Sequence, residues 1–321
     1  MATTAAGTTG TPDTAGTAPT ARQPSNAVRR TGDWARRAPL LPALVFTIVM
    51  TQLPFVATLV ISFMNWNAYY PDERGFAGFD NFARVVTDTN TRSAVVVTIL
   101  LTVSVVLVSL VLGLGIALLL DRKFLGRGAV RTLMITPFLI VPVAAALLWK
   151  HALYNPEYGL LNGLLKAVFG ASAPQPDWIT NNPLIAIIAA LVWQWTPFMM
   201  LILLAGLQSR PLDVVEAARI DGASAWQIFT NMTLPHLRQY IELSALLGAI
   251  YVVQNFDHVF TITSGGLGTA NLPYFIYQTF YTAQDYGRAS AAGVVVVIGT
   301  IIIATFALRT VSTLFREESG R

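Results

Sequence analysis

Few of the residues that commonly carry out chemistry are present in this chain. It has no cysteine and only three histidines, at 151, 236 and 258, among 321 residues. Disulfides, thiolate metal sites and cysteine nucleophiles are therefore excluded, and the scattered histidines do not predict a metal site. No Gly-Lys dipeptide occurs, so the chain has no Walker A loop for a nucleotide. We predict that this chain has no catalytic residue and binds no metal or cofactor.

The clearest functional candidates lie in a charged segment between two apolar runs, EAARIDGASAWQIFTNMTLPH at 216–236. Pro211 is tolerated in the first turn of a helix, and Gly222 can end that helix because glycine adopts left-handed angles at low cost. Ser224 and Gln227 have the spacing of a capping box, which predicts a second short helix. We therefore expect two short helices with a glycine between them, and Pro235 ending the segment and leading into the next apolar run. An ordinary capped loop without function is equally consistent with this local chemistry.

The rest of the chain is too apolar for a soluble protein. It is 54% hydrophobic and 12% charged, whereas soluble proteins are about 25% charged. Several runs of about 18 or more residues carry no charge and are long enough to cross the hydrocarbon layer as helices. A weaker candidate is bracketed by Glu242 and Asp257 and could be re-entrant or amphipathic. With it, the six predicted spans are 39–64, 94–120, about 132–149, 183–207, about 239–262 and 289–308.

The distribution of lysine and arginine predicts the orientation of these spans. If six spans alternate across the membrane, one side collects more than twice as many lysines and arginines as the other. The positive-inside rule then places both termini and residues 208–242 in the cytoplasm. We predict an all-α polytopic membrane protein with six transmembrane helices. Its expected parts are a disordered tail (1–38), a membrane domain (39–315) that contains the 208–236 loop, and a C-terminal tail (316–321).

The charged segment resembles the EAA loop of the membrane subunits of bacterial ABC importers. That loop has the pattern Glu-Ala-Ala, then Asp-Gly-Ala, an apolar residue and Leu-Pro. The matching residues are Glu216, Ala217, Ala218, Asp221, Gly222, Ala223, Phe229, Leu234 and Pro235. The resemblance extends over about residues 39–315 and implies the importer-type permease fold. It also implies that the loop docks in a groove on a separate ATPase subunit, with Glu216 and Gly222 as the coupling positions.

The same resemblance implies an assembly in the bacterial plasma membrane. Its partners would be a second homologous permease subunit, two ATPase subunits and an extracellular substrate-binding protein, with no nucleic acid involved. ATP and Mg would be bound by the partner ATPase, and this chain would not be an enzyme. The stretch at 256–281 resembles the carbohydrate group of these permeases, and "NLPYFIYQ" is similar to the version in sugar-alcohol permeases. The implied substrate is a sugar or a sugar alcohol.

Polar and aromatic residues near two span positions are candidates for the substrate path. They are Gln194, Trp195, Tyr251, Asn255 and Asp257. Amide groups and flat aromatic rings are suited to binding carbohydrates, and polar groups inside a membrane are commonly functional. The alternatives are that the tryptophans belong to an interfacial aromatic belt and that Asp257 lies at a water-facing helix end.

Three other classes of membrane protein are alternatives. An ion-coupled secondary carrier would normally contain internal repeats and charged residues at mid-membrane, and no strong span has an acidic residue at its centre. A channel for a small polar solute would not explain why the chain contains the charged, capped segment. An intramembrane hydrolase would need a paired nucleophile and base or a metal site, and neither is evident.

Overall fold

The computed structural model describes residues 38–318 of the chain. The described residues fall into two units, which divide between Phe55 and Val56. The described part of the first unit comprises a short 3₁₀ turn, η1 (Ala38–Leu40), and most of α2 (Leu41–Ser62), an apolar helix long enough to cross a membrane. Most of the predicted 1–38 tail lies outside the described residues, as does the end of the predicted C-terminal tail.

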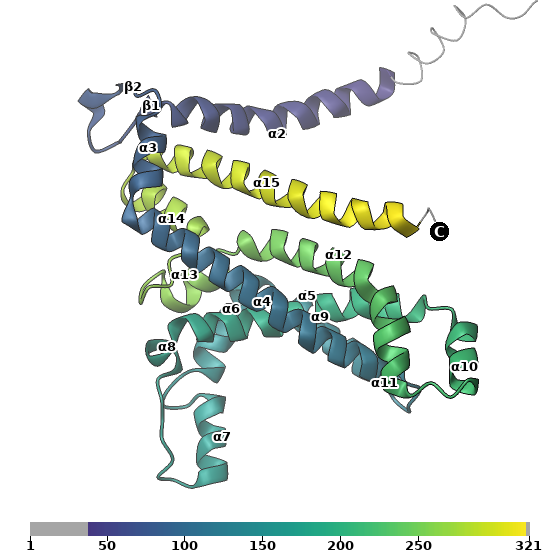
Figure 1. Ribbon diagram of the computed structural model, residues 1–321. Helices are drawn as coiled ribbons and strands as arrows, with labels where there is room; N and C mark the ends of the chain where they lie inside the picture. Colours follow the sequence, from purple (N-terminus) through teal and green to yellow (C-terminus); the bar gives the residue numbers. More distant parts are fainter. Residues whose placement is uncertain (1–37, 319–321) are drawn as a thin grey trace, which may run out of the picture. The chain divides into compact units, whose positions relative to one another are not determined.

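The described part of the second unit is mostly helical and contains one small hairpin of β1 (Met64–Asn65) and β2 (Gly75–Phe76). Helices α4 and α9 pack along each other, and α12 packs against both (Figure 1). The helices up to residue 208 are α3 (Asp80–Thr87), α4 (Thr89–Asp121), α5 (Arg127–Leu139), α6 (Pro142–Leu147), α7 (Leu160–Phe169), α8 (Trp178–Asn181) and α9 (Pro183–Gln208). The later helices are α10 (Leu212–Ile220), α11 (Ala225–Ile228), α12 (Leu234–Val253), α13 (Asp257–Thr263), α14 (Leu272–Tyr277) and α15 (Tyr286–Glu318).

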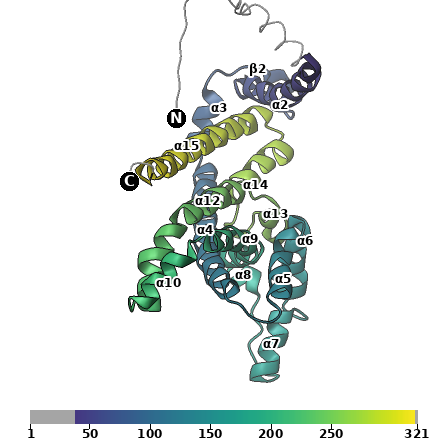
Figure 2. The ribbon, with the colours of Figure 1, turned by 90° about the vertical axis from the view of Figure 1, so that its right-hand side faces the viewer.

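Three π-helical stretches extend or join these helices. They are η3 (Leu148–Leu153) after α6, η4 (Phe229–Thr233) between α11 and α12, and η5 (Gln278–Thr282) after α14. A short 3₁₀ turn, η2 (Pro71–Glu73), lies in the hairpin loop. Helix α7 extends away from the packed helices in both views (Figure 2).

The close packing of α4 on α9 depends on a small residue. A Cβ atom at Gly113 would lie 2.9 Å from the backbone nitrogen of Met200, so any larger residue would push the two helices apart. Met199, Leu203 and Leu191 of α9 are fully buried. Helix α9 therefore contributes buried side chains to two apolar clusters of the second unit.

Predicted spans correspond to helices in the structure, but two of them are broken. Helices α2, α4 and α9 satisfy the length and composition of a membrane span. The 132–149 run is divided into α5 and α6, which are bent by 96°. Val141 is extended, and Pro142 begins α6, because a residue that precedes proline avoids the helical region.

The 239–262 run is also divided, with a bend of 50° between the helix that ends at Val253 and α13. At this break the Asn271 side chain donates a hydrogen bond to the backbone oxygen of Asn255, which satisfies a carbonyl that a continuous helix would have used. The described apolar part of α15, Tyr286–Ile302, is shorter than the other spans. The described residues thus provide three continuous spans, or five if each bent pair crosses once, and the count of six stays a prediction.

Candidate functional site

The charged segment folds as two short helices, as its sequence predicts. Helix α10 ends at Ile220, and Gly222 follows with φ +88°, an angle that is unfavourable for residues with a side chain. The Ser224 hydroxyl accepts a hydrogen bond from the Gln227 N–H, and the Gln227 side chain accepts one from the Ser224 N–H. This reciprocal capping box starts α11. We use the name coupling segment for residues 210–236.

Pro235 lies where the coupling segment leads into α12, the predicted fifth span. The chain continues from α11 through η4 into α12, and Pro235 lies in the first turn of α12. The Leu234 N–H donates to the Phe229 oxygen, five residues earlier. Proline crowds the preceding turn of an α-helix and has no N–H, and the wider π-helical turn just before Pro235 accommodates it.

The coupling segment exposes large apolar side chains. Ile220 is 86% exposed, Trp226 71% and Leu212 62%, while Val215 and Ile228 are buried. Contiguous exposed apolar side chains typically mark a surface that binds a partner. Glu216, Ala217, Asp221 and Gly222 are exposed as well, whereas Ala218 and Ala223 are half-buried. Sequence reasoning did not single out Ile220 or Trp226, although apolar residues in such a short charged stretch were the available signal.

Trp195 and Tyr251, two of the predicted path residues, lie in contact. Their rings stack with centroids 5.4 Å apart, and Phe198 lies edge-on to both. The ring of Phe138 in α5 also packs on Trp195, with the ring centroids 5.6 Å apart. The four rings come from α5, α9 and α12, and Tyr251 is 57% exposed. Phe138 and Phe198 were missed in the sequence because aromatic residues are common in any membrane helix.

The other predicted path residues lie in different surroundings. Gln194 is buried and donates a hydrogen bond from Nε2 to the backbone oxygen of Ile140, at 2.9 Å. It therefore satisfies a carbonyl at the break between α5 and α6 and lies apart from the Trp195 stack. Asn255 lies at the break before α13, where its Nδ2 is 3.2 Å from Nδ1 of the buried His258 and its Oδ1 is buried without a partner. Asp257, half-buried, begins α13.

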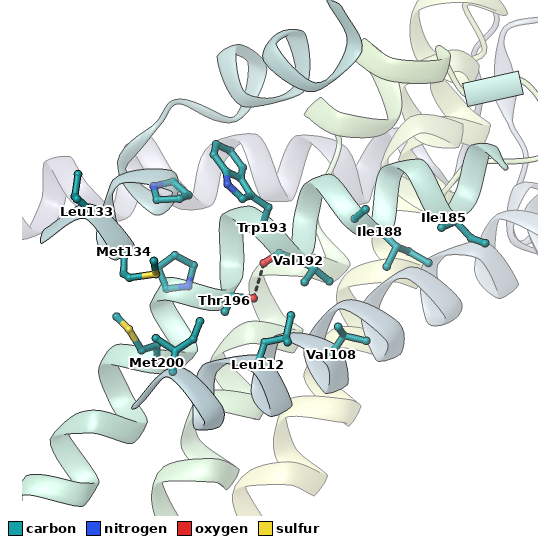
Figure 3. A pocket seen from close by; sticks show the side chains of 14 residues that line it. Val108, Leu112, Leu133, Met134, Ile185, Ile188, Val192, Trp193, Thr196 and Met200 are labelled. Atoms are coloured by element: carbon teal, nitrogen blue, oxygen red, sulfur yellow. Dashed lines mark hydrogen bonds between the residues drawn. The ribbon is translucent and has the colours of Figure 1, made fainter. Parts of the chain in front are cut away.

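A cavity of about 650 Å³ lies between α4, α5 and α9. Figure 3 shows Leu133, Met134 and Trp193 among the side chains that line it. The Thr196 hydroxyl donates within its own helix to the Val192 oxygen at 2.6 Å, so it is already satisfied. A sugar would need several free polar groups in the wall, and none of the five predicted path residues lines this cavity. The cavity suits an apolar occupant.

Comparison with known proteins identifies the class of this fold. Residues 109–315 match the family model described as the binding-protein-dependent transport system inner membrane component. This chain belongs to that family. The matched range contains the whole coupling segment, the Trp195–Tyr251 contact and the two broken spans.

Permeases of known systems are similar along most of their length. The trehalose/maltose transport system permease protein MalF of Thermococcus litoralis is 34% identical over 88% of this chain and 92% of that protein. The trehalose transport system permease protein SugA of Mycobacterium tuberculosis is 32% identical over 83% of this chain and 84% of that protein. A solved bacterial ABC transporter involved in the import of alginate has a TM-score of 0.75 at 21% identity, covering 89% of this chain and 97% of that one, which shows the shared fold.

These findings confirm several of the sequence-based predictions. The chain is a multi-pass permease subunit of an ABC importer, it has the importer-type permease fold, and it is not an enzyme. ATP hydrolysis therefore takes place on a partner ATPase, and the secondary-carrier and channel alternatives are not favoured. The coupling segment exposes apolar side chains that a partner subunit can bind. Binding of a partner there requires no catalytic residue in this chain.

Proposed function

We propose that this permease carries a sugar or sugar alcohol across the plasma membrane. The support comes from its relatives, two of which are named for trehalose or trehalose and maltose transport. A solved structure with a similar fold is an alginate transporter in complex with an alginate pentasaccharide-bound periplasmic protein. The observation in this chain that carries the proposal is the exposed Tyr251 ring stacked on Trp195, because sugars present flat apolar faces that pack on aromatic rings.

The proposed topology has six spans and two cytoplasmic termini. The spans are α2, α4, α9, the two bent pairs α5–α6 and α12–α13, and α15. The excess of lysine and arginine on the side of the coupling segment supports this orientation. The membrane domain then covers residues 39–315, and the remaining residues form the two tails.

The proposed assembly contains a second homologous permease, two ATPase subunits and an extracellular binding protein. ATP and Mg belong to the ATPase subunits, and this chain binds no cofactor. In the coupling segment, the residues assigned to docking and coupling are Glu216, Ala217, Ala218, Asp221, Gly222, Ala223, Leu234 and Pro235. The exposed Ile220 and Trp226 beside them support a docking role for this surface.

Transport proceeds by alternating access in this proposal. ATP must bind the outward-facing state better than the inward-facing state, because a ligand shifts an equilibrium only through differential affinity. Trp195 and Tyr251 contact the solute in the path, together with Asn255 and Asp257 at the break between α12 and α13. Gln194 does not contact the solute in this proposal. It stabilises the break between α5 and α6 through its hydrogen bond to the Ile140 oxygen.

Co-purification from native membranes in mild detergent tests the proposal. The expected result is recovery of an ATPase subunit and a second permease in stoichiometric amounts, and uptake of a sugar or sugar alcohol that requires ATP after reconstitution. Recovery of the chain alone, with uptake that needs no ATP, would overturn it. ATP-dependent uptake of only another class of solute, such as an amino acid, would show that the proposed substrate class is wrong.

A further inference from the structure

Arg210 occupies the position at which the chain leaves α9 and enters the coupling segment. Each nitrogen of its guanidinium group donates to a different acceptor. Nε donates to the Leu207 oxygen in the last turn of α9 at 3.1 Å, and Nη1 donates to the Thr233 hydroxyl in η4 at 2.8 Å. Nη2 pairs with the carboxylate of Asp121, the last residue of α4, at 2.8 Å. One side chain therefore joins the ends of three elements that are distant in sequence.

The Arg210 contacts are sheltered from water. The Arg210 side chain is 14% exposed and that of Asp121 is 25% exposed, and Thr233 is buried at 2%. Hydrogen bonds in which one or both groups are charged are shorter and stronger than neutral ones, and water competes less with them when they are partly buried. This geometry uses the planar fork of an arginine, which a lysine cannot reproduce.

A second set of contacts beside Arg210 joins α9 to α12. The Ser209 hydroxyl lies 2.8 Å from the Tyr240 hydroxyl and 3.1 Å from His236 Nε2. The same His236 nitrogen is 3.1 Å from the Gly206 oxygen. Both ends of the coupling segment are thus attached to the same place, at the ends of α4 and α9 and the beginning of α12.

We propose that Arg210 is a positioning residue that makes the coupling segment move as one body with α4, α9 and α12. This inference rests on the coupling role proposed above. A displacement of α10 and α11 is transmitted to the spans only if the connections between them are stiff, since a flexible connection would absorb it. The Arg210 side chain is too buried to form part of the ATPase-docking surface. We therefore expect a change of Arg210 to alter how movement of the coupling segment reaches the spans, and to leave ATPase binding unchanged.

The alternative is that Arg210 only stabilises the end of α9. The variant Arg210→Lys distinguishes the two, because it keeps the positive charge and loses the three-way fork. The matched control is Arg238→Lys, since Arg238 pairs with Glu242 at 2.9 Å within α12 and is 62% exposed. This control makes the same substitution in an arginine–carboxylate pair that joins no separate elements.

The complete importer, reconstituted in vesicles with its ATPase and binding protein, is assayed for solute uptake and ATP hydrolysis together. We expect Arg210→Lys to lower the solute transported per ATP by about fivefold while the ATPase still co-purifies, and Arg238→Lys to leave the ratio unchanged. An unchanged ratio in Arg210→Lys would overturn the inference. Failure of the proposed function would be recognised separately, because the wild-type vesicles would then take up no solute with ATP.

A cross-linking experiment covers the case in which Arg210→Lys does not assemble. The chain has no cysteine, so the double variant Asp121→Cys and Arg210→Cys can be joined selectively by a short bifunctional thiol reagent. We expect low transport per ATP before cross-linking and recovery afterwards, because the covalent link replaces the ion pair. Loss of transport that the cross-link does not reverse, with the subunits still assembled, would contradict the inference.

Discussion

The ring of Trp195 in α9 stacks on the ring of Tyr251 in α12, with an angle of 27° between the ring planes. The two residues are far apart in sequence and are brought together because α9 and α12 pack against each other. Tyr251 is 57% exposed, so one side of the stack is open. This contact connects the packing of two spans with a surface that can receive the apolar face of a sugar.

Removal of the exposed ring is expected to weaken solute recognition. In the variant Tyr251→Ala, loss of one aromatic face should raise the solute concentration for half-maximal uptake by about three- to tenfold. Tyr251→Phe is the matched control, because it keeps the ring and removes only the hydroxyl. The measurement is the concentration dependence of uptake in reconstituted vesicles. Unchanged uptake in the alanine variant would exclude Tyr251 from the path.

Gln194 is expected to affect stability more than recognition. Gln194→Leu removes the donor to the Ile140 oxygen and leaves a half-buried carbonyl without this partner, which should cost about 1 kcal/mol of unfolding free energy. Thermal unfolding of the purified permease in detergent measures this loss. A normal unfolding temperature together with an altered solute preference would instead place Gln194 in contact with the solute.

Gly222 is expected to matter for its backbone angle, because a Cβ atom there would meet nothing within 4 Å. Gly222→Pro cannot adopt φ +88° and removes an N–H that donates to the Arg219 oxygen at 3.1 Å. We expect this variant to reach the membrane but to uncouple ATP hydrolysis from uptake. Gly222→Asn, which tolerates left-handed angles, should keep coupling. Wild-type uptake in the proline variant would refute the coupling assignment.

Binding of the ATPase is expected to depend on the exposed apolar residues of the coupling segment. Ile220→Ser should weaken co-purification of the ATPase by at least about tenfold in affinity if Ile220 becomes buried in the complex. Phe169→Ser at the end of α7 is the control, since Phe169 is 70% exposed and lies outside the coupling segment. Equal ATPase binding by both variants would show that Ile220 is not part of the interface.

The ion pair of Asp88 and Arg288 joins the start of α4 to α15. Burial by itself would raise the pKa of Asp88, but the charge of Arg288 and hydrogen bonds from Thr91 outweigh it and hold the pKa below its usual value. The resulting stabilisation is present above the unfolded pKa of about 3.9 and is lost as the pH falls through the lower folded pKa.

Asp88→Asn keeps an oxygen that can cap α4 and removes only the charge. We expect it to lower the stability of the permease by about 1 kcal/mol at neutral pH, and we expect the difference from the wild type to vanish in acid. The apparent unfolding temperature in detergent checks both parts, measured at neutral pH and then at decreasing pH from about 4 to below the lowered folded pKa of Asp88. A difference that persists in acid would mean that the charge is not its cause.

Features that depend on local chemistry could be predicted from the sequence. The spacing of Ser224 and Gln227 and the glycine at 222 specify two short helices, because caps and backbone angles depend on neighbouring residues. The apolar runs that became α4 and α9 are long and free of charge, and no other structure hides the backbone from hydrocarbon over such a length. The motif at 216–235 identified the family for the same reason, since its residue types and spacing are local.

Features that depend on contacts between distant residues required the tertiary structure. The sequence by itself determined that Arg210 follows a span and that Asp121 ends another, but only the packing of α4 along α9 brings their charges together. In the same way, a run of apolar residues at 132–149 predicts a span, and the break at Pro142 persists because Gln194 of another helix satisfies the carbonyl of Ile140. A hydrogen bond or ion pair forms only between groups within a few ångströms, and for residues far apart in the chain the folded structure alone sets that distance.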